Sequence, residues 1–295
     1  MYVVKIQEKT PRVSVCVVTY NQEKYIRHCL QSILDQKTDF DFEVLVADDC
    51  STDGTQVILN EFLVRYPKVI KLYLHSANIG PYKNFVFVHR QANAEYIAHV
   101  DGDDYCLPGK LKMQSNVLDR ESQCNLVWHK MGIEDANGRL NESTERNLSK
   151  IKFYRKDIIK YMSIGSNSSK MYRKSMRDFV EPDFDVVDYF ANVEQVRDGY
   201  ARLIDDHCYG VYRAGIGISA TGIKTRVALT NCFYFFANKY PQHRLEVNSA
   251  ALMYFLGDIK NGRRTWIMFF WVWIKTFHIL SIVNFIPHFK FSRLL

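Results

Sequence analysis

The sequence predicts an α/β protein in which helices flank a mainly parallel sheet. Short β-branched and apolar runs alternate with segments of helical periodicity up to about residue 120, a pattern typical of βαβ units. Of the 295 residues, 47% are hydrophobic, which is enough to bury a full core. Acidic residues follow several of the predicted strands, where parallel sheets bind their ligands.

The first two strands and their helices are predicted as follows. The run VSVCVV, residues 13–18, is β-branched and ends at Thr-Tyr-Asn, which suits a helix cap. In residues 26–34 apolar side chains recur at the spacing of one helix face. The second strand, FEVLVA at residues 42–47, runs into two aspartates. A further helix opens after STDGT, which offers several N-cap residues.

Two more strands complete this pattern. The third is predicted at residues 69–75, before a turn at Asn78 and Gly80. A helix then covers about residues 81–92, and the fourth strand, YIAHV, covers residues 96–100. Because the carboxyl ends of parallel strands meet at one edge of a sheet, we expect the polar residues that follow these strands to converge on one crevice.

Three aspartates follow the fourth strand in the sequence VDGDDY. Two carboxylates about 4 Å apart repel by roughly 4 kcal/mol near a protein surface, so we expect a cation there. Asp101 and Asp103 are two residues apart, so in an extended segment their side chains point to the same side. Such a pair suits Mg²⁺ or Mn²⁺, which also bind substrate phosphates. The alternative is an exposed Asp-Gly turn that caps a helix beginning near Pro108.

Two common phosphate-binding loops are absent from the sequence. The first strand is not followed by G-x-G-x-x-G, and the chain contains no G-K-[ST] P-loop. A bound nucleotide would therefore have to be held by acidic side chains and a metal. Asp48 and Asp49 are weaker evidence for such a site, because their sequence is also a plausible cap and turn.

Charge, cysteine content and the amino-terminal sequence indicate which partners the protein binds and where in the cell it is located. The net charge is +7, but no segment of the first two thirds gathers lysines and arginines into a stripe, which argues against nucleic acid. After Asp258 no acidic residue remains while basic residues continue, which favours a negatively charged membrane surface. The 7 cysteines form no C-x-x-C pair, which predicts reduced thiols. The amino terminus lacks the layout of a signal peptide, so we expect a cytoplasmic location.

The carboxyl-terminal segment differs from the rest of the chain. It includes the apolar runs TWIMFFWVWI (265–274) and FHILSIVNFI (277–286). A helix spanning a bilayer here would place Lys275 near the centre, at a cost of ~2.5–3.5 kcal/mol. We therefore expect a segment in the membrane interface, anchored by Trp266, Trp271 and Trp273. The alternative is a helix buried against the sheet domain or in a dimer.

Four segments occur in this order: SVCVVTYNQEKYIRHCLQSILDQ, EVLVADDCSTDGT, NIGPYKN and AEYIAHVDGDDYCLPGKLKMQ. Together they resemble the family 2 glycosyltransferases, which have the GT-A fold. The resemblance is strong over about residues 11–114 and continues faintly to DYF (188–190) and GVYRAGIGIS (210–219). It implies an inverting transfer of a sugar from a nucleotide donor, usually a UDP-sugar, to an acceptor hydroxyl, with Mn²⁺ or Mg²⁺ as cofactor.

The resemblance also implies roles for individual residues. Asp103 would bind the metal, and Asp101 would share that site and face the sugar or ribose. Asp188 in VVDYF matches the general base, although Asp185 and Glu194 lie close to it in sequence. The residues at the uracil would be Thr19, Tyr20, Asp48 and Asp49. Those on the diphosphate or acceptor side would be Lys83, Tyr212 and Arg213.

The expected function follows from this resemblance. The chain would move a hexose (glucose, galactose or N-acetylhexosamine) from a UDP-sugar to a saccharide on a polyprenyl diphosphate, in O-antigen or capsule synthesis. It would lie peripherally on the inner face of the cell membrane. The alternatives are a polyprenyl-phosphate glycosyltransferase and a non-catalytic partner that binds nucleotide sugars or membranes.

The expected organisation has two parts. A GT-A domain would cover residues 1–222, with its nucleotide-sugar half at about 11–124 and its acceptor half at about 125–222. A helical, membrane-associating region would follow at residues 223–295.

Overall fold

The structure is a computed structural model, and it describes residues 10–135, 137–141, 151–162, 164–215 and 222–286. The strands of the first half are β1 (Val13–Thr19), β2 (Phe42–Asp48), β3 (Ile70–Leu74), β4 (Tyr96–Asp101) and β5 (Tyr105–Cys106). Those of the second half are β6 (Cys124–Glu134), β7 (Leu140–Asn141), β8 (Lys152–Phe153), β9 (Met171–Arg173) and β10 (Tyr200–Arg213).

The helices of the sheet domain are α1 (Ile26–Leu34), α2 (Thr55–Arg65), α3 (Pro81–Gln91), α4 (Lys110–Arg120), α5 (Arg155–Tyr161) and α6 (Asp188–Val196). The carboxyl-terminal helices are α7 (Ile223–Lys239), α8 (Arg244–Lys260) and α9 (Trp266–Lys275). Short 3₁₀ turns lie at Asn167–Ser169, Lys174–Met176 and Pro241–His243.

The strands join in one sheet with the order β3-β2-β1-β4-β9-β6-β10-β5. In addition, β7 pairs with β6 and β8 pairs with β10. β1 pairs in parallel with β2 and β4, and β2 pairs in parallel with β3, which confirms the βαβ prediction for this half. The other half is mixed, because β9 runs antiparallel between β4 and β6. β9 is entered from a 3₁₀ turn, and an antiparallel strand needs no crossover helix.

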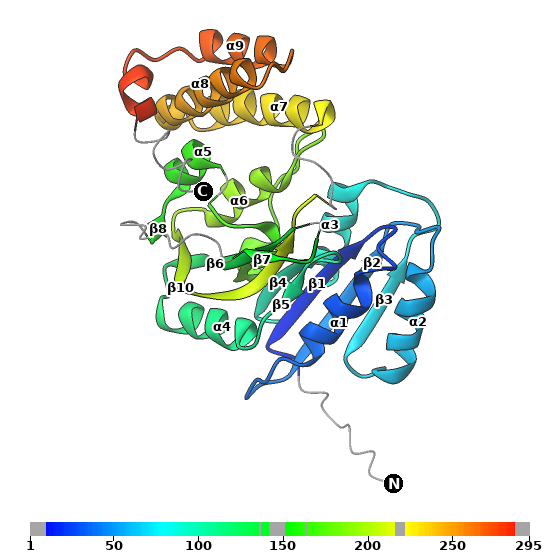
Figure 1. Ribbon diagram of the computed structural model, residues 1–295. Coiled ribbons are helices and arrows are strands. Elements are labelled where there is room, and N and C mark those ends of the chain that lie inside the picture. The colour runs from blue at the N-terminus through cyan, green and yellow to red at the C-terminus, as the bar shows by residue number, and fades with distance from the viewer. Residues whose placement is uncertain (1–9, 136, 142–150, 163, 216–221, 287–295) are drawn as a thin grey trace.

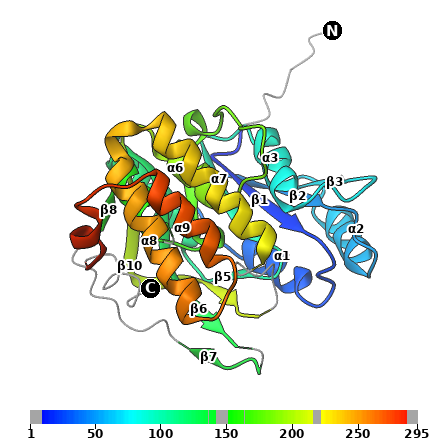
Figure 2. The ribbon, with the colours of Figure 1, turned by 90° about the horizontal axis from the view of Figure 1, so that it is seen from above.

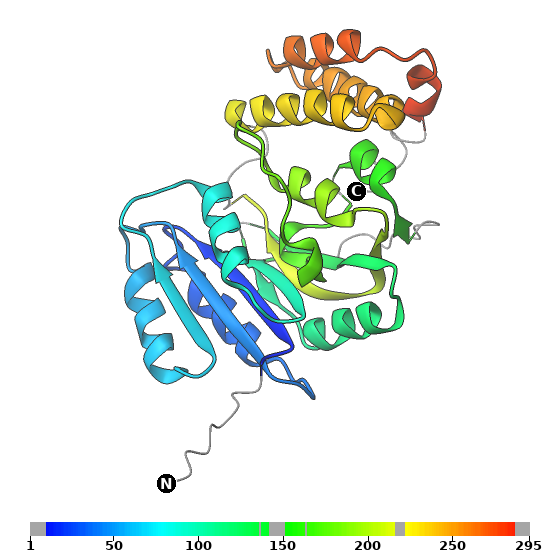
Figure 3. The ribbon, with the colours of Figure 1, turned by 180° about the vertical axis from the view of Figure 1, so that it is seen from behind.

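Helices cover both faces of the sheet (Figures 1 and 3). Along β1, Val13, Val15 and Val17 belong to the hydrophobic cluster that also contains residues of α1, α2 and α4. Cys16 points to the opposite face, into the cluster shared with α3, α5 and α6. This alternation is the period of two expected for a central strand. The predicted α/β class with flanking helices is confirmed.

The helices α7, α8 and α9 form a further layer over α5 and α6 (Figures 1 and 2). α6 contacts α7 through aromatic side chains, with ring centroids 5.3 Å apart for Phe190 and Phe236. Phe269 of α9 is fully buried in the same cluster. α7 begins at Ile223, where the carboxyl-terminal region was predicted to start, but this region and the sheet domain share one hydrophobic core.

The two faces of α9 differ in their surroundings. Phe269 and Val272 are buried, whereas Trp271 is 53% and Ile274 is 42% exposed. Trp273, predicted to lie at a membrane interface, is partly buried and stacks on Phe255. No helix within the described part of the chain is long and apolar enough to span a membrane.

Candidate active site at the DGDD loop

The loop of residues 101–104, here called the DGDD loop, follows β4 and lies against the turn that follows β1. A Cβ atom on Gly102 would lie 2.4 Å from Gln22 Oε1 and 3.0 Å from the Thr19 side chain, so a larger residue would force both side chains to shift. The backbone N–H of Asp101 donates to the Ser168 hydroxyl at 3.0 Å. The loop is therefore fixed on one side by the β1 turn and on the other by the segment that leads to β9.

Asp101 and Asp104 are both bound by Ser168. Asp101 Oδ1 accepts from His99 Nε2 at 3.1 Å, and its Oδ2 lies 3.0 Å from Ser168 Oγ. Asp104 Oδ1 accepts the backbone N–H of Arg213 at 3.0 Å, and its Oδ2 also contacts Ser168 Oγ. Asp104 is 1% exposed. It shapes the loop from inside, whereas the Asp101 side chain remains 33% exposed.

The three carboxyls differ in acidity. Burial opposes ionisation of Asp101, but His99, Ser168 and Lys170 outweigh burial and hold the pKa of its carboxyl below the ordinary value. Burial and the Asp101 charge raise the pKa of Asp103 to about 6 and that of Asp104 to about 8. Burial and repulsion by Asp101 therefore disfavour ionisation of Asp103 and Asp104, whereas Asp101 remains the most acidic of the three.

These residues fit a divalent cation. No group of three or more histidine, cysteine or acidic side chains with metal-binding geometry occurs in the described residues. Mg²⁺ and Mn²⁺ do not require one, since they are commonly bound by one or two carboxylates, water and substrate phosphates. Asp101 and Asp103 supply two hard oxygen ligands, and a cation between them would relieve the repulsion by Asp101 that, after burial, raises the pKa of Asp103.

Asp188 is the first residue of α6, and solvent reaches its side chain. Burial of its surroundings nevertheless raises the pKa of the Asp188 carboxyl, and the charge of Asp101 adds to this effect. The positive charge of Lys170, a fully buried residue that directly follows the Asn167–Ser169 turn, acts in the opposite direction and lowers this pKa. The structure therefore brings the predicted base, the DGDD loop and a buried lysine together, although their sequence positions span almost ninety residues.

The neighbours of Asp188 in sequence have other surroundings. Glu194 is 7% exposed, accepts a bond from Lys239 Nζ at 2.7 Å and binds the Tyr240 hydroxyl at 3.0 Å. It joins α6 to α7 and is not available as a base. Asp185 is exposed in the segment before α6.

Arg213 is enclosed by protein behind the DGDD loop. It is 6% exposed, and its guanidinium donates to the Asp103 carbonyl at 2.7 Å and to His28 Nδ1 at 2.8 Å. Tyr105 lies 4.7 Å from the guanidinium carbon. Arg213 therefore holds the loop in place, and direct contact with a diphosphate stays a prediction. Tyr212 is 41% exposed beside the carboxylates.

The Asp48 and Asp49 carboxylates are occupied by nearby backbone and side chains. Asp48 accepts bonds from the Ser51 N–H at 2.9 Å and from Gln56 Nε2 at 2.7 Å, as expected for a cap and turn. Asp49 accepts the backbone N–H groups of Ile79 at 2.7 Å and Gly80 at 3.0 Å, so it fixes the loop before α3. Their predicted contact with uracil remains untested.

The other predicted nucleotide residues lie around this edge. Tyr20 is 45% exposed, whereas Thr19 is 3% exposed and its hydroxyl binds Gln22 Oε1 at 2.8 Å. Lys83 is exposed on the first turn of α3, next to the loop that Asp49 fixes.

Comparison with known proteins decides the family. The sequence profile of Glycosyl transferase family 2 matches residues 14–178. The chain belongs to this family. The family match confirms the predicted resemblance and shows that the chain carries a glycosyltransferase domain.

Individual relatives of this family-2 domain are more distant. An uncharacterised protein of Mycobacterium tuberculosis is 30% identical over 214 residues, which cover 68% of this chain and 60% of that protein. The poly(ribitol-phosphate) β-N-acetylglucosaminyltransferase TarS of Staphylococcus aureus is 34% identical over 167 residues, covering 50% of this chain and 28% of TarS. The chain thus spans less than two thirds of the length of these relatives.

Solved structures confirm the fold of the family-2 domain. The crystal structure of Staphylococcus aureus TarS residues 1–349 with UDP-GlcNAc matches with a TM-score of 0.63 and 23% identity, over 81% of this chain and 71% of that one. A mannosyltransferase from Pyrobaculum calidifontis in complex with GDP-Man and Mn²⁺ matches with a TM-score of 0.57 and 17% identity, over 95% of this chain and 88% of that one. The predicted GT-A fold class is confirmed.

Three residues of this family-2 site are missing from the prediction: His99, Ser168 and Lys170. Ser168 and Lys170 belong to the sequence GSNSSK, which has neither strand nor helix periodicity. His99 occupies a position of an apolar strand. A lysine within a small polar run and a histidine within a buried strand are the signals that could have identified two of them, because both groups need a partner when buried.

Proposed function

We propose that this chain is an inverting, metal-dependent glycosyltransferase that takes its sugar from a UDP-sugar. The observation that carries the proposal is that Asp101, at the carboxyl end of β4, lies close enough for its charge to act on both Asp103 and Asp188. The relationship to TarS, whose structure was determined with UDP-GlcNAc, supports N-acetylglucosamine as the first sugar to test.

The proposed mechanism assigns separate tasks to these carboxylates. Asp103 and Asp101 would hold Mn²⁺ or Mg²⁺, which when bound stabilises the negative charge of the departing diphosphate. Asp188 accepts the proton of the acceptor hydroxyl as this oxygen attacks the anomeric carbon. The raised pKa of Asp188 makes it a stronger base than an aspartate with the ordinary pKa. A single base suffices for inversion.

We further propose that the acceptor is a saccharide carried by a polyprenyl diphosphate, and that the protein lies on the inner face of the cell membrane. Support comes from α9 and the residues after it, which expose apolar side chains: Trp266, Ile267, Trp271, Ile274, Phe277, Ile279, Leu280, Ile282 and Val283. Exposed cations, Lys260, Arg264 and Lys275, flank this surface. Apolar residues bordered by cations complement an anionic lipid surface.

A role in surface polysaccharide synthesis rests on the functions of relatives. The abequosyltransferase RfbV of Salmonella typhimurium is 31% identical over 119 residues, covering 40% of this chain and 36% of RfbV. TarS acts on poly(ribitol-phosphate), according to its name. We infer that this chain contributes one sugar to an O-antigen or capsule repeat.

A UDP-release assay tests the proposal. Purified protein with Mn²⁺ is incubated with UDP-GlcNAc, UDP-glucose or UDP-galactose and with polyprenyl-diphosphate saccharides from bacterial membranes. We expect release with one donor, loss of release with EDTA, and loss in Asp103→Ala. Asp183→Ala, which removes an exposed aspartate away from the loop, is the matched control.

The same assay separates the alternatives. A product formed on polyprenyl phosphate alone would favour the polyprenyl-phosphate transferase. UDP-sugar binding without any turnover would favour a non-catalytic partner. Undiminished activity in EDTA would contradict the metal assignment.

A further inference from the structure

A chain of hydrogen bonds leads from Asp101 into the protein interior. His99 Nε2 lies 3.1 Å from Asp101 Oδ1, and His89 Nε2 lies 2.9 Å from His99 Nδ1. The Tyr172 hydroxyl lies 2.6 Å from His89 Nδ1. The three residues come from β4, α3 and β9, and they are 0%, 3% and 0% exposed. No part of the proposed mechanism above uses them.

The donor and acceptor of each hydrogen bond between Asp101 and Tyr172 can be assigned. An ionised carboxylate only accepts, and a neutral imidazole carries one N–H and one acceptor nitrogen. Both rings are buried, at 3% and 0% exposure for His89 and His99, which favours the neutral imidazole. His99 therefore donates to Asp101 and accepts from His89, and His89 accepts from the Tyr172 hydroxyl. Every ring nitrogen of the two histidines is then satisfied.

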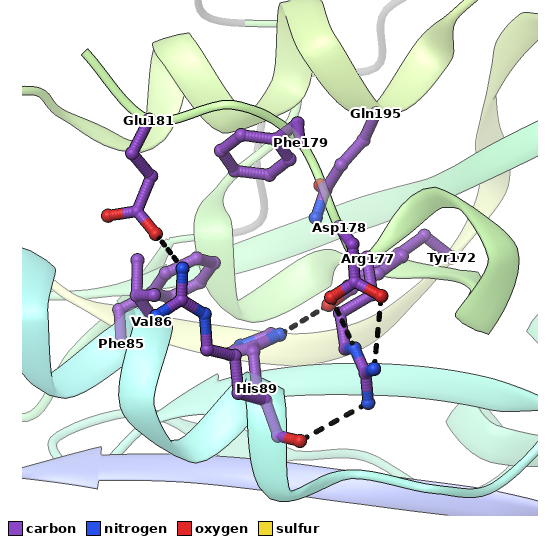
Figure 4. A pocket seen from close by; sticks show the side chains of 10 residues that line it. Phe85, Val86, His89, Tyr172, Arg177, Asp178, Phe179, Glu181 and Gln195 are labelled. Carbon is purple, nitrogen blue, oxygen red and sulfur yellow. Dashed lines mark hydrogen bonds and ion pairs between the residues drawn. The ribbon is translucent and has the colours of Figure 1, made fainter.

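Aromatic packing holds both imidazole rings in place. Phe85 stacks on His89 with ring centroids 4.0 Å apart and lies 5.0 Å from His99. The Tyr172 ring lies 5.7 Å from His89 and is nearly parallel to it, at 11°. Figure 4 shows the part of this hydrogen-bond chain that is farthest from Asp101. There His89 and Tyr172 line a cavity of about 50 Å³ together with Phe85 and Gln195.

We propose that His99, held by His89 and Tyr172, is a positioning residue for Asp101. His99 binds Oδ1 and Ser168 binds Oδ2, so the carboxylate cannot rotate and its remaining lone pairs keep one direction. This inference rests on the proposed function, in which Asp101 shares the metal and donor site. The three residues touch neither sugar nor metal and act only through Asp101.

Mn²⁺ binding without turnover tests this inference. The free Mn²⁺ signal in electron paramagnetic resonance gives Kd for the wild type, His99→Phe and His99→Gln. The phenylalanine keeps an aromatic ring against Phe85 but removes the bond to Asp101, so we expect Kd to rise about tenfold or more. Glutamine restores an N–H donor and should recover most of the affinity. His243→Gln, which alters a partly buried histidine directly before α8, should leave Kd unchanged.

A second variant covers the case in which His99→Phe does not fold. Tyr172→Phe removes only the hydroxyl at the far end of the chain. We expect the ¹⁵N spectrum of the imidazoles to show a change in the His89 tautomer, together with a several-fold rise in the Mn²⁺ Kd. An unchanged tautomer pattern would refute the proposed order of donors.

The outcomes distinguish this inference from the proposed function. Wild-type protein that binds no Mn²⁺ in the presence of UDP would contradict the metal site itself. Wild-type binding that persists with equal Kd in a folded His99→Phe variant would overturn the positioning role and leave the function standing. Loss of affinity in His243→Gln as well would show a general effect of altering histidines and would also overturn it.

Discussion

Ser168 connects two aspartates of the DGDD loop that differ in protonation. Its hydroxyl carries one hydrogen but contacts both Asp101 and Asp104. With the pKa of Asp104 raised to about 8 by burial and the Asp101 charge, Asp104 is mostly protonated at neutral pH and donates to Ser168, which donates to Asp101. Residues that look equivalent in the sequence therefore differ in charge, because Asp104 is more deeply buried and Asp101 is stabilised by His99 and Lys170.

Asp104→Asn tests this assignment through the pH dependence of stability. Between about pH 4 and pH 8 the folded protein keeps a proton that the unfolded chain has lost. Wild-type stability therefore falls as pH rises, by at most about 1.4 kcal/mol per pH unit. Asparagine offers the same acceptor to the Arg213 N–H and a donor to Ser168, and it has no proton to lose. Urea unfolding at pH 5 to 8 in EDTA should show the variant gaining stability relative to wild type as pH rises.

A constant difference between these two proteins would contradict the protonated state of Asp104. Asp183→Asn, at an exposed position, controls for the general effect of removing one acidic group.

Asp188→Asn tests whether Asp188 is the general base. The variant should bind UDP with wild-type affinity, measured calorimetrically, while turnover falls by about 10² to 10⁴. Asp185→Asn, three residues earlier and exposed, should keep turnover. Normal turnover of Asp188→Asn would place the base elsewhere.

Among the helices, α6 positions Asp188, the proposed base, and α9 provides an exposed apolar surface. Asp188 begins α6, and the next two residues, Tyr189 and Phe190, are buried against α7. The first turn of α6 is therefore fixed by aromatic packing from the carboxyl-terminal layer.

Phe190→Ala should weaken this attachment. Deleting a buried phenylalanine costs about 3–5 kcal/mol, because it removes apolar contact and leaves a cavity. Urea unfolding measures the loss, and turnover should fall further than UDP affinity, since the donor loop is held independently by Ser168 and Arg213. An equal fall in both would contradict a selective effect on the base.

The apolar face of α9 is tested with vesicles that contain phosphatidylglycerol. Trp271→Ser and Ile274→Ser each remove apolar area from an exposed position, worth about 1.5–3 kcal/mol if fully buried in lipid. We expect co-sedimentation to fall about tenfold for each. Val64→Ser on α2, where the side chain is 80% exposed, is the matched control. Unchanged sedimentation of the α9 variants would refute membrane binding by this face.

At the scale of the whole molecule, the sequence predicts the half of the fold in which local patterns are strong. β1 to β4 and the helices between them begin and end within a few residues of their predicted positions, because apolar residues dominate each strand and polar or turn residues follow it. The second half could not be predicted in this way. β9 has three residues, and its insertion between β4 and β6 depends on contacts distant in sequence.

The candidate site likewise combines residues with a local sequence signal and residues that only the fold brings close. Asp101 and Asp103 stand out in the sequence because they follow a strand, and Asp188 stands out through the family resemblance of VVDYF; the roles of all three stay predictions. Ser168 and Lys170 reach the site across the sheet, from 67 residues beyond Asp101 in the case of Ser168. The packing of Trp273 against Phe255 likewise depends on how α8 and α9 meet.

The aromatic contact between α6 and α7 also has a consequence for the order of synthesis. Tyr189 and Phe190 leave the ribosome well before Phe233 and Phe236, so the growing chain carries an uncovered aromatic surface until α7 emerges. Such surfaces promote aggregation of incomplete chains. A fragment cut at residue 222 would retain that surface permanently, so the helices beyond it are needed for a soluble sheet domain.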